Sequence, residues 1–479
     1  MSGGDGWTRR GAIGAGAALL TLPGVARGPM GDAPVRTAAG SFLGTRENGV
    51  RALRGIRYGR AERFRAPVGV AEPGRTIVAD RFGAVCPQQG PYGPQDEDCL
   101  FLNIWTPETD PRARRPVMLY VHGGAYSNFA DSGNAGQLDL VLALQWVRDN
   151  IAAFGGDPGR VMLFGQSGGG AKIATLMGMD AAQGLFHRAT TMSGQQVTAS
   201  GPLHATERAR AYLAKLGLGE GDLSPLRAMP VERLVAALDA RDPIMPGGVY
   251  FGPVLDMRWL TRHPFWPDAN PLGNGIPMML GNVRDETRAF IPSDSAKMRD
   301  LDWDNLAARI APEMRIDALP EWVVAQYRAH YPSWSPSDVF YGATTAARSW
   351  RGQVIEAEAR AAAGVPAWVY QVDFASRSDP RRGAFHTMDI PLVFGTLGAT
   401  GSQTGTGADA QAASRAMQDR FTAFAAGGDP NRSGLTPWPR YDLTRRATMI
   451  FDARSRVEDD PRGWQRELFA RIPYIQPGT

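Results

Sequence analysis

Short apolar runs alternate along this chain with longer segments of helical periodicity. The runs are continuous and lack polar breaks, which is typical of strands buried on both faces of a sheet, and they lie at 117–121, 161–164, 277–281, 367–374 and 448–451. Between them, apolar residues recur at spacings of three and four on one helical face, at Leu140, Leu144, Val147, Ile151 and Phe154. A second helical stretch covers 411–426. The alternation predicts an α/β fold with a mostly parallel central sheet flanked by helices.

The chain of 479 residues shows no internal repeat. Large α/β enzymes often form one unit with insertions, so we expect a single catalytic domain over residues 27–479. Two segments, at about 202–262 and 301–348, are helical in pattern with Pro and Gly breaks. We expect them to be insertions that cover a pocket.

A GxSxG motif follows the apolar run at 161–164, within Phe164-Gly165-Gln166-Ser167-Gly168-Gly169-Gly170. Glycines at these places permit a sharp strand-to-helix turn that presents the serine, and the Ala-rich segment 171–177 suits the helix. The motif predicts that Ser167 is a nucleophile. The alternative is a Gly-rich turn that happens to hold a serine. A phosphate-binding loop is excluded, because Lys172 is neither preceded by Gly nor followed by Ser or Thr.

A nucleophilic serine needs donors for the oxyanion, and a candidate loop follows the apolar run at 117–121. It reads His122-Gly123-Gly124-Ala125-Tyr126, a loop of the HGGG type that supplies backbone N–H groups. We expect the donors to be the N–H groups of Gly124, Ala125 and Gly168. The His122 side chain is interpreted as structural, bonding the loop backbone.

The serine also needs a base and an orienting acid. Of the six histidines, the order Ser, Asp/Glu, His leaves four as the better-placed candidates downstream of Ser167, which are His204, His263, His330 and His386. His386 stands out because it lies in a loop between the apolar run 367–374 and the apolar segment 390–394. Asp285 and Glu286, just after the run 277–281, are the acid candidates.

The chain resembles the type B carboxylesterases, the group that includes cholinesterases and bacterial p-nitrobenzyl esterases. The matching motifs occur in family order over about residues 36–470: Glu97 to Trp105, His122 to Tyr126, Asn150-Ile151 with Phe154 to Pro158, the GxSxG motif, Met192 to Gly194, Arg284 to Glu286, Gly383 to His386 with Asp389-Ile390 and Phe394-Gly395, Gly428 to Asn431, and Trp438-Pro439. The resemblance implies an α/β-hydrolase fold. It further implies Ser167 as nucleophile, His386 as general base and acid, Glu286 rather than Asp285 as the orienting carboxylate, and Ser193 as a supporting hydroxyl near that acid.

Three positions depart from the family pattern in small ways. Gln166 and Gly168 stand where the family usually has Glu and Ala, and Ala125 replaces the third glycine of the oxyanion loop. A larger departure lies between Ser127 and Asp131, where roughly forty residues of the family are missing, more than the scale of a βαβ step. We therefore expect the sheet to lack one central strand, which leaves the outer edge of strand 117–121 unpaired unless the N-terminal strands cover it.

The remaining sequence features concern location and stability. Thr8-Arg9-Arg10, an apolar stretch at 11–22 and small residues up to Ala26 predict a twin-arginine export signal over 1–26, and hence a periplasmic or extracellular protein. In such a compartment, Cys86 and Cys99 are expected to form a disulfide that closes a turn-rich loop. The family resemblance agrees with this pairing. The net charge of +4 is interspersed, which indicates neither nucleic acid nor a membrane as partner.

Together these features predict a serine carboxylesterase that hydrolyses small carboxylic esters through an acyl-enzyme intermediate. No metal site and no cofactor are expected, since two cysteines and no HExxH pattern leave no zinc site. The alternative from another class is a non-catalytic or defective protein of the same fold, which the internal deletion between Ser127 and Asp131 would favour.

Overall fold

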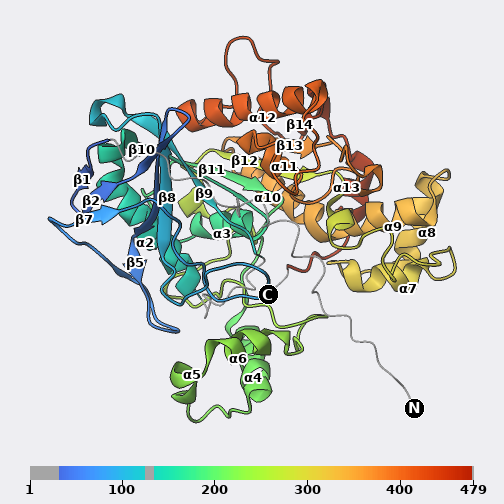
Figure 1. Ribbon diagram of the computed structural model, residues 1–479. Helices are drawn as coiled ribbons and strands as arrows, with labels where there is room; N and C mark the ends of the chain where they lie inside the picture. Colours follow the sequence, from blue (N-terminus) through green and yellow to red (C-terminus); the bar gives the residue numbers. More distant parts are fainter. Residues whose placement is uncertain (1–31, 125–133, 477–479) are drawn as a thin grey trace.

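The computed structural model describes residues 32–124 and 134–476, and its centre is a seven-stranded sheet (Figure 1). The strand order is β15-β14-β13-β12-β11-β10-β9. Neighbouring strands are parallel except for β15, which is antiparallel to β14. The bounds are β9 Arg115–Val121, β10 Gly156–Gln166, β11 Arg188–Met192, β12 Met278–Val283, β13 Ala367–Val372, β14 Ala447–Phe451 and β15 Arg456–Asp459. The predicted α/β-hydrolase arrangement is thus observed, and each predicted apolar run is a strand.

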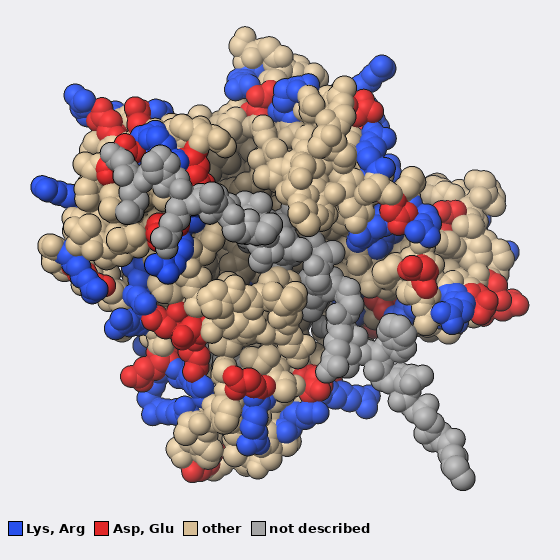
Figure 2. Space-filling model, in the orientation of Figure 1, with Lys and Arg blue, Asp and Glu red and all other residues tan. Residues whose placement is uncertain are grey.

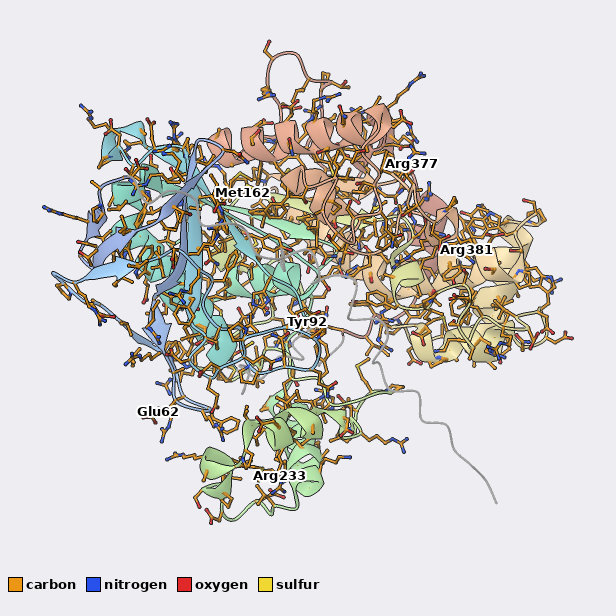
Figure 3. The ribbon with its side chains drawn as sticks, viewed as in Figure 1. Glu62, Tyr92, Met162, Arg233, Arg377 and Arg381 are labelled. Carbon is orange, nitrogen blue, oxygen red and sulfur yellow. The ribbon has the colours of Figure 1, made fainter. Side chains whose placement is uncertain are left out.

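Side chains that alternate along β10 enter two different cores. Val161 and Leu163 belong to a core with residues of helices α2 (Ala135–Asn150) and α3 (Gly168–Leu176). Met162, labelled in Figure 3, and Phe164 belong to a core with residues of α11 (Asp389–Phe394) and α12 (Ala408–Gly427). This alternation is the period of two that a strand imposes, and it explains why β10 is apolar throughout its second half.

The predicted helix with five periodic apolar residues ends earlier than its pattern suggests. Helix α2 stops at Asn150, and Ile151 and Phe154 lie in a short 3-10 turn that follows it. Gly155 then takes a positive φ of 80° before β10 begins. Both side chains nevertheless remain in the core beside α2.

Small sheets and helices surround the central sheet. The N-terminal strands pair in three small sheets, formed by β1 (Val35–Thr37), β2 (Gly40–Leu43) and β7 (Thr76–Val78); by β3 (Thr45–Glu47), β4 (Val50–Arg57) and β8 (Phe101–Thr106); and by β5 (Gly59–Arg60) and β6 (Val68–Gly69). The other helices are α4 (Pro202–Leu216), α5 (Pro225–Ala228), α6 (Val231–Ala236), α7 (Leu306–Ile310), α8 (Pro320–His330), α9 (Pro336–Thr345), α10 (Arg351–Ala362) and α13 (Gly463–Ala470).

The two predicted helical insertions form two separate clusters. Helices α4 to α6 share one small core and lie at the bottom of Figure 1, where Arg233 of α6 is labelled in Figure 3. Helices α7 to α9 share another core with Val354 of α10 and Phe469 of α13. Each cluster therefore has its own apolar centre outside the two cores of the sheet.

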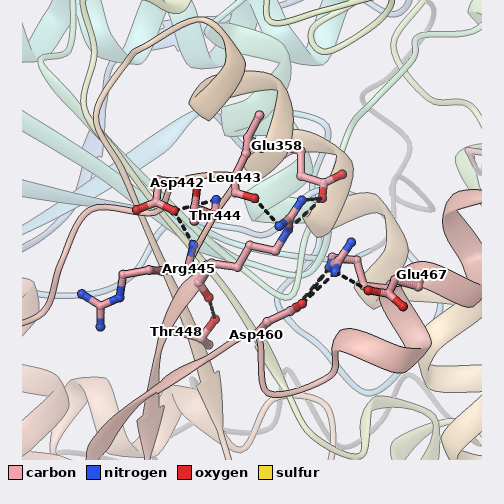
Figure 4. Close-up of polar contacts among 10 residues, drawn as sticks. Glu358, Asp442, Leu443, Thr444, Arg445, Thr448, Asp460 and Glu467 are labelled. Atoms are coloured by element: carbon pink, nitrogen blue, oxygen red, sulfur yellow. Dashed lines mark hydrogen bonds and ion pairs between the residues drawn. The ribbon is translucent and has the colours of Figure 1, made fainter.

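Ion pairs join the last helices to the far edge of the sheet (Figure 4). Arg446, just before β14, lies 3.3 Å from Glu358 of α10, and Arg466 of α13 lies 2.7 Å from Asp460 after β15. The Asp442 carboxylate accepts the N–H groups of Thr444 and Arg445 in the turn that leads into β14. These contacts hold the turns at the ends of β14 and β15 against the helices.

Strand β9 pairs with β10 on one side, and no described strand pairs with its other side. The N-terminal strands do not take that place, because they form sheets of their own. Six of the seven β9 residues are half-buried, whereas β12 and β13 are buried throughout. Within the described residues, the predicted absence of one central strand therefore leaves β9 at the edge. The shortened segment between Ser127 and Asp131 lies outside the described residues.

Candidate active site

The turn between β10 and α3 places Ser167 in a strained conformation. Its φ of 59° and ψ of −127° belong to a region that residues with side chains rarely enter. The glycines around it are sterically required: a Cβ on Gly165 would lie 2.6 Å from the Val121 carbonyl oxygen, and one on Gly169 only 2.0 Å from it. Strand β9 thus approaches the turn so closely that only glycine fits, which is the physical basis of the GxSxG pattern.

The loop after β9 runs beside this turn. A Cβ on Gly123 would lie 2.8 Å from the Gln166 carbonyl oxygen, and Gly124 has a φ of 108°. The N–H of Gly168, the first residue of α3, has no partner within the helix, since the first four N–H groups of a helix never do. Ala125, the remaining predicted oxyanion donor, lies outside the described residues.

The His122 ring bonds the loop backbone, as the sequence predicted for a structural histidine. Its Nδ1 lies 2.9 Å from the Gly123 carbonyl oxygen. The positive charge of Lys172 on α3 is the largest influence on His122 and lowers the pKa of its ring to about 4. The ring is therefore neutral at pH 7 and adds no positive charge to the loop.

Glu286 and His386 form a buried pair. Glu286 Oε2 accepts a hydrogen bond from His386 Nδ1, while its Oε1 accepts from Asn282 Nδ2 at 2.9 Å and from the Val283 N–H at 3.1 Å. Glu286 is completely buried and His386 is 6% exposed. The Phe290 ring lies 4.8 Å from the His386 ring, centroid to centroid. A carboxylate with both oxygens bonded is held rigidly, and it fixes the orientation of the imidazole.

Asp285, the other acid candidate, is directed elsewhere. Its Oδ2 accepts the Ala384 N–H at 2.9 Å and lies 3.2 Å from Arg284 Nε. The Asp285 carboxylate therefore supports the backbone that leads to His386 without bonding the ring. The structure brings Glu286, and not Asp285, onto the histidine.

Ser167 Oγ has no hydrogen-bond partner among the described residues, although His386 lies close to the turn. The Gln166 side chain lies over the face of the His386 ring, with its Nε2 at 3.2 Å from His386 Nε2 and 3.5 Å from Nδ1. The Glu286–His386 pair thus contacts Gln166, the residue directly before Ser167 in the turn.

Ser193, predicted to support the acid, follows β11 with a φ of 50°. Its N–H donates to the Gly281 carbonyl oxygen at 2.7 Å. Its Oγ is buried and makes no hydrogen bond within the described part of the chain, including none to Glu286. The hydroxyl and the acid are therefore not joined here.

A further carboxyl group, that of Asp389, lies near the pair at the start of α11. It is completely buried. Burial, and next the negative charge of Glu286, raise the pKa of Asp389 to about 7. A negative charge at Glu286 is therefore accompanied by a second carboxyl group that retains its proton over much of the acidic range.

The predicted disulfide is not formed in the structure. Cys86 and Cys99 are both thiols. A side-chain hydrogen bond with Cys86, followed by burial, raises the pKa of the Cys99 thiol. The two side chains therefore lie close together without a covalent bond between them.

Two polar side chains that contact the pair, those of Asn282 and Gln166, had no role in the sequence predictions. Asn282 is a polar residue inside an otherwise apolar strand, four residues before Glu286, and this interruption is the signal that could have identified it. Gln166 was visible as a departure inside the GxSxG motif, but its contact with His386 bridges 220 positions of sequence. Only the fold reveals that contact.

Comparison with known proteins identifies the family. A model of the carboxylesterase family matches residues 31–132 and 128–467. The para-nitrobenzyl esterase of Bacillus subtilis is 30% identical over 90% of this chain and 97% of its own, and the phenmedipham hydrolase of Pseudarthrobacter oxydans is 30% identical over 86% and 94%. The solved carboxylesterase of Geobacillus stearothermophilus superimposes with a TM-score of 0.80 at 31% identity, over 91% of this chain and 99% of that one.

The comparisons also bear on the shortened segment. The alignment with the Bacillus subtilis esterase spans 497 positions, more than the 479 residues of this chain, so the relative has positions that this chain lacks. The family match is divided at 128–132, next to the segment that the sequence predicts to be shortened. These relatives are named for esterase and hydrolase activities, and nothing in them favours the non-catalytic alternative. The chain belongs to the carboxylesterase family, with the α/β-hydrolase fold, and is a carboxylic ester hydrolase.

Proposed function

We propose that Ser167, His386 and Glu286 are the catalytic triad of this esterase. The observation that carries the proposal is the buried Glu286–His386 pair, which lies beside the strained turn that presents Ser167. Because Glu286 fixes His386 with its Nδ1 protonated, Nε2 is left as the basic nitrogen.

In the proposed reaction, Ser167 Oγ attacks the ester carbonyl carbon as its proton passes to His386 Nε2. The negative charge on the former carbonyl oxygen is stabilised by the N–H groups of Gly124, Ala125 and Gly168. The bond to the alcohol then breaks, and the alcohol leaves with the proton from His386. Water attacks the acyl-enzyme with His386 again as base, and Ser167 is released together with the carboxylic acid.

The acyl-enzyme can be trapped directly. A fluorophosphonate forms a stable phosphonyl ester with an activated serine, and mass spectrometry of the digested protein identifies the labelled residue. The proposal predicts labelling at Ser167, lost in His386→Gln. Labelling at another serine, or unchanged labelling in His386→Gln, would refute the assignment of this pair.

We also propose that the substrate has an apolar part. An apolar cavity of about 580 Å³ lies where the two helical insertions approach each other, and it is lined mainly by residues of the loop after β11, of 244–255 and of 311–315. Charged side chains of both signs are interspersed on the face shown in Figure 2, which favours no strongly charged substrate. Small esters of apolar acids or alcohols fit this chemistry best.

Export and oxidation of the cysteine pair remain a proposal that rests on the sequence of residues 1–26, outside the described part of the chain. No helix among residues 32–124 and 134–476 combines the length and apolar character needed to cross a bilayer. Intact-mass measurement of the protein from the periplasm should give a chain that lacks the leader and has two fewer hydrogen atoms than the dithiol form. A full-length, reduced chain found only in the cytoplasm would contradict this proposal.

A further inference from the structure

A second and smaller cavity lies where helices α10 and α13 meet strands β13 and β14. Its volume is about 30 Å³, which gives room for about two water molecules or one small ion. Its wall includes three arginines, Arg446, Arg462 and Arg466, but only one carboxylate, that of Asp460. None of the proposed catalytic residues lines it. The wall is therefore rich in positive charge.

Two of these three arginines have carboxylate partners (Figure 4). Arg446 lies 3.3 Å from Glu358 of α10. Arg466 lies 2.7 Å from Asp460 and 3.2 Å from Glu467, which is exposed. These ion pairs balance the charges of two arginines and leave the third without a carboxylate in the wall.

The third arginine, Arg462, makes no ion pair among the described residues. Its Nε donates to Gln465 Oε1, its guanidinium lies 4.3 Å from the centre of the Trp350 ring, and its buried Nη1 makes no hydrogen bond. Burial is the largest influence on the pKa of Arg462 and lowers it. The carboxylates that oppose this effect, those of Asp285 and Asp373, are both paired with another arginine.

A fourth arginine, Arg351, borders the same cavity from the start of α10. It is 8% exposed, and its Nε and Nη1 are buried without a hydrogen bond in the described part of the chain. Burial lowers its pKa, and the charges of Glu358, Arg466 and Tyr441 act on that pKa as well, so Arg351 lies close to these residues. Glu358, the carboxylate of this group, is itself paired with Arg446. A buried guanidinium without a counter-charge is costly, and here two lie beside one cavity.

We propose that this cavity is a binding site for one small monovalent anion of the size of chloride. The four arginines at the cavity are accompanied by three carboxylates, so one positive charge remains to be balanced. The buried N–H groups of Arg462 and Arg351 supply donors to the anion. Gln353 also lines the cavity and is 2% exposed. Its Oε1 makes no hydrogen bond, so the amide can turn its Nε2 toward the anion without losing one.

An anion at this place would join α13 to α10 and to the end of β14, so it should stabilise the folded protein. The first test is the thermal unfolding midpoint in chloride from zero to about 200 mM, with gluconate, which is too large for the cavity, keeping the ionic strength constant. We expect a saturating rise of about 1–3 °C. Arg462→Gln should abolish the rise. Arg454→Gln, which removes the same charge at an exposed position, should keep it.

A second variant supplies the negative charge from the chain itself. Gln353→Glu has nearly the same shape and places a carboxylate at the cavity. We expect its midpoint without chloride to reach that of the chloride-saturated wild type, and to respond no further to chloride. If the cavity holds only water, the same substitution buries an unneeded charge and lowers the midpoint.

These results are independent of the proposed function, because they do not involve turnover. A wild-type midpoint that does not depend on chloride, or a dependence that Arg462→Gln retains, would overturn the anion site. If Arg462→Gln does not fold, a lowered midpoint in Gln353→Glu overturns it equally. Anomalous scattering from crystals grown in bromide should show one ion beside Arg462 and Arg351, and bromide on the surface alone would contradict the proposal.

Discussion

At the residue scale, two neighbouring carboxylates have separate tasks. Glu286 bonds the His386 ring, and Asp285 bonds the backbone N–H two residues before that ring. Both are needed to place the histidine, but only Glu286 can stabilise a positive charge on it directly. Two adjacent residues thus have different functions: Glu286 an electrostatic one and Asp285 a structural one.

This division predicts a large difference between two matched variants. Glu286→Gln should lower kcat by about 10³- to 10⁴-fold, because the amide cannot hold the ring in the required proton arrangement. Asp285→Asn keeps the acceptor for the Ala384 N–H and should change kcat by less than about tenfold. Steady-state kinetics of the two purified variants gives the comparison. Equal losses would mean that Glu286 is not the orienting acid.

A second buried carboxyl group predicts the pH dependence of stability. Glu356 on α10 is completely buried, and burial raises its pKa from the ordinary 4.5 to about 8, opposed by a hydrogen bond from the Gln196 N–H. Between those values the folded protein holds a proton that the unfolded chain releases. Its contribution to stability is therefore complete below pH 4.5 and is lost as the pH rises through 8.

The matching variant is Glu356→Gln, which keeps an acceptor for Gln196. Its free energy of unfolding, relative to wild type, should rise by about 1.4 kcal/mol per pH unit between pH 5 and 8. Denaturant unfolding at several pH values measures this, with the exposed Glu321→Gln as control. A difference that stays constant with pH would show that Glu356 is ionised in the folded protein throughout.

At the element scale, the turn after β10 is possible only because neighbouring backbones approach it closely. A Cβ on Gly194, after β11, would lie 1.9 Å from the Ser167 carbonyl oxygen. We expect Gly194→Ala to cost about 1–3 kcal/mol of stability and most of the activity, since the turn must shift. Gly275→Ala, where a Cβ meets nothing within 4 Å, is the control. Thermal unfolding and kcat would be measured on both, and a harmless Gly194→Ala would contradict the account of the turn.

The unpaired side of β9 predicts uneven protection within the sheet. Amide hydrogens of 115–121 should exchange faster than those of 278–283, because β12 is bonded to strands on both sides. Hydrogen exchange with mass spectrometry distinguishes the two peptides. Equal protection would mean that some other part of the chain pairs with β9.

These elements also show which features of the fold and of the site could be predicted from the sequence alone. Five strands of the central sheet, β9, β10, β12, β13 and β14, were predictable because each contains a continuous apolar run, whereas β11 and β15 carry polar residues and were not predicted. The Ser167 turn was predictable because its glycines have one steric explanation. From the residues alone the acid stayed open between Asp285 and Glu286, and only the family resemblance favoured Glu286. The contacts that Gln166 makes with His386 and Asn282 makes with Glu286 could not be predicted. Only the fold brings β10, β12 and the loop that holds His386 together.

At the scale of the whole molecule, the sheet positions the proposed site, and the two helical insertions line a cavity whose walls include none of the proposed catalytic residues. If the cavity receives the apolar part of the ester, Ile244→Asp should raise KM for p-nitrophenyl octanoate at least tenfold and change KM for the acetate much less. Ile244→Leu keeps the apolar lining and serves as control. Equal effects on both esters would place the acyl chain elsewhere.

The central claim is that this chain is a serine esterase that acts through Ser167, despite its shortened sheet. The most direct test is hydrolysis of p-nitrophenyl butyrate by the monodisperse protein, with equally folded Ser167→Ala measured beside it. We predict turnover by the wild type that falls by several orders of magnitude in the variant. Equal rates from the two folded proteins would contradict the account.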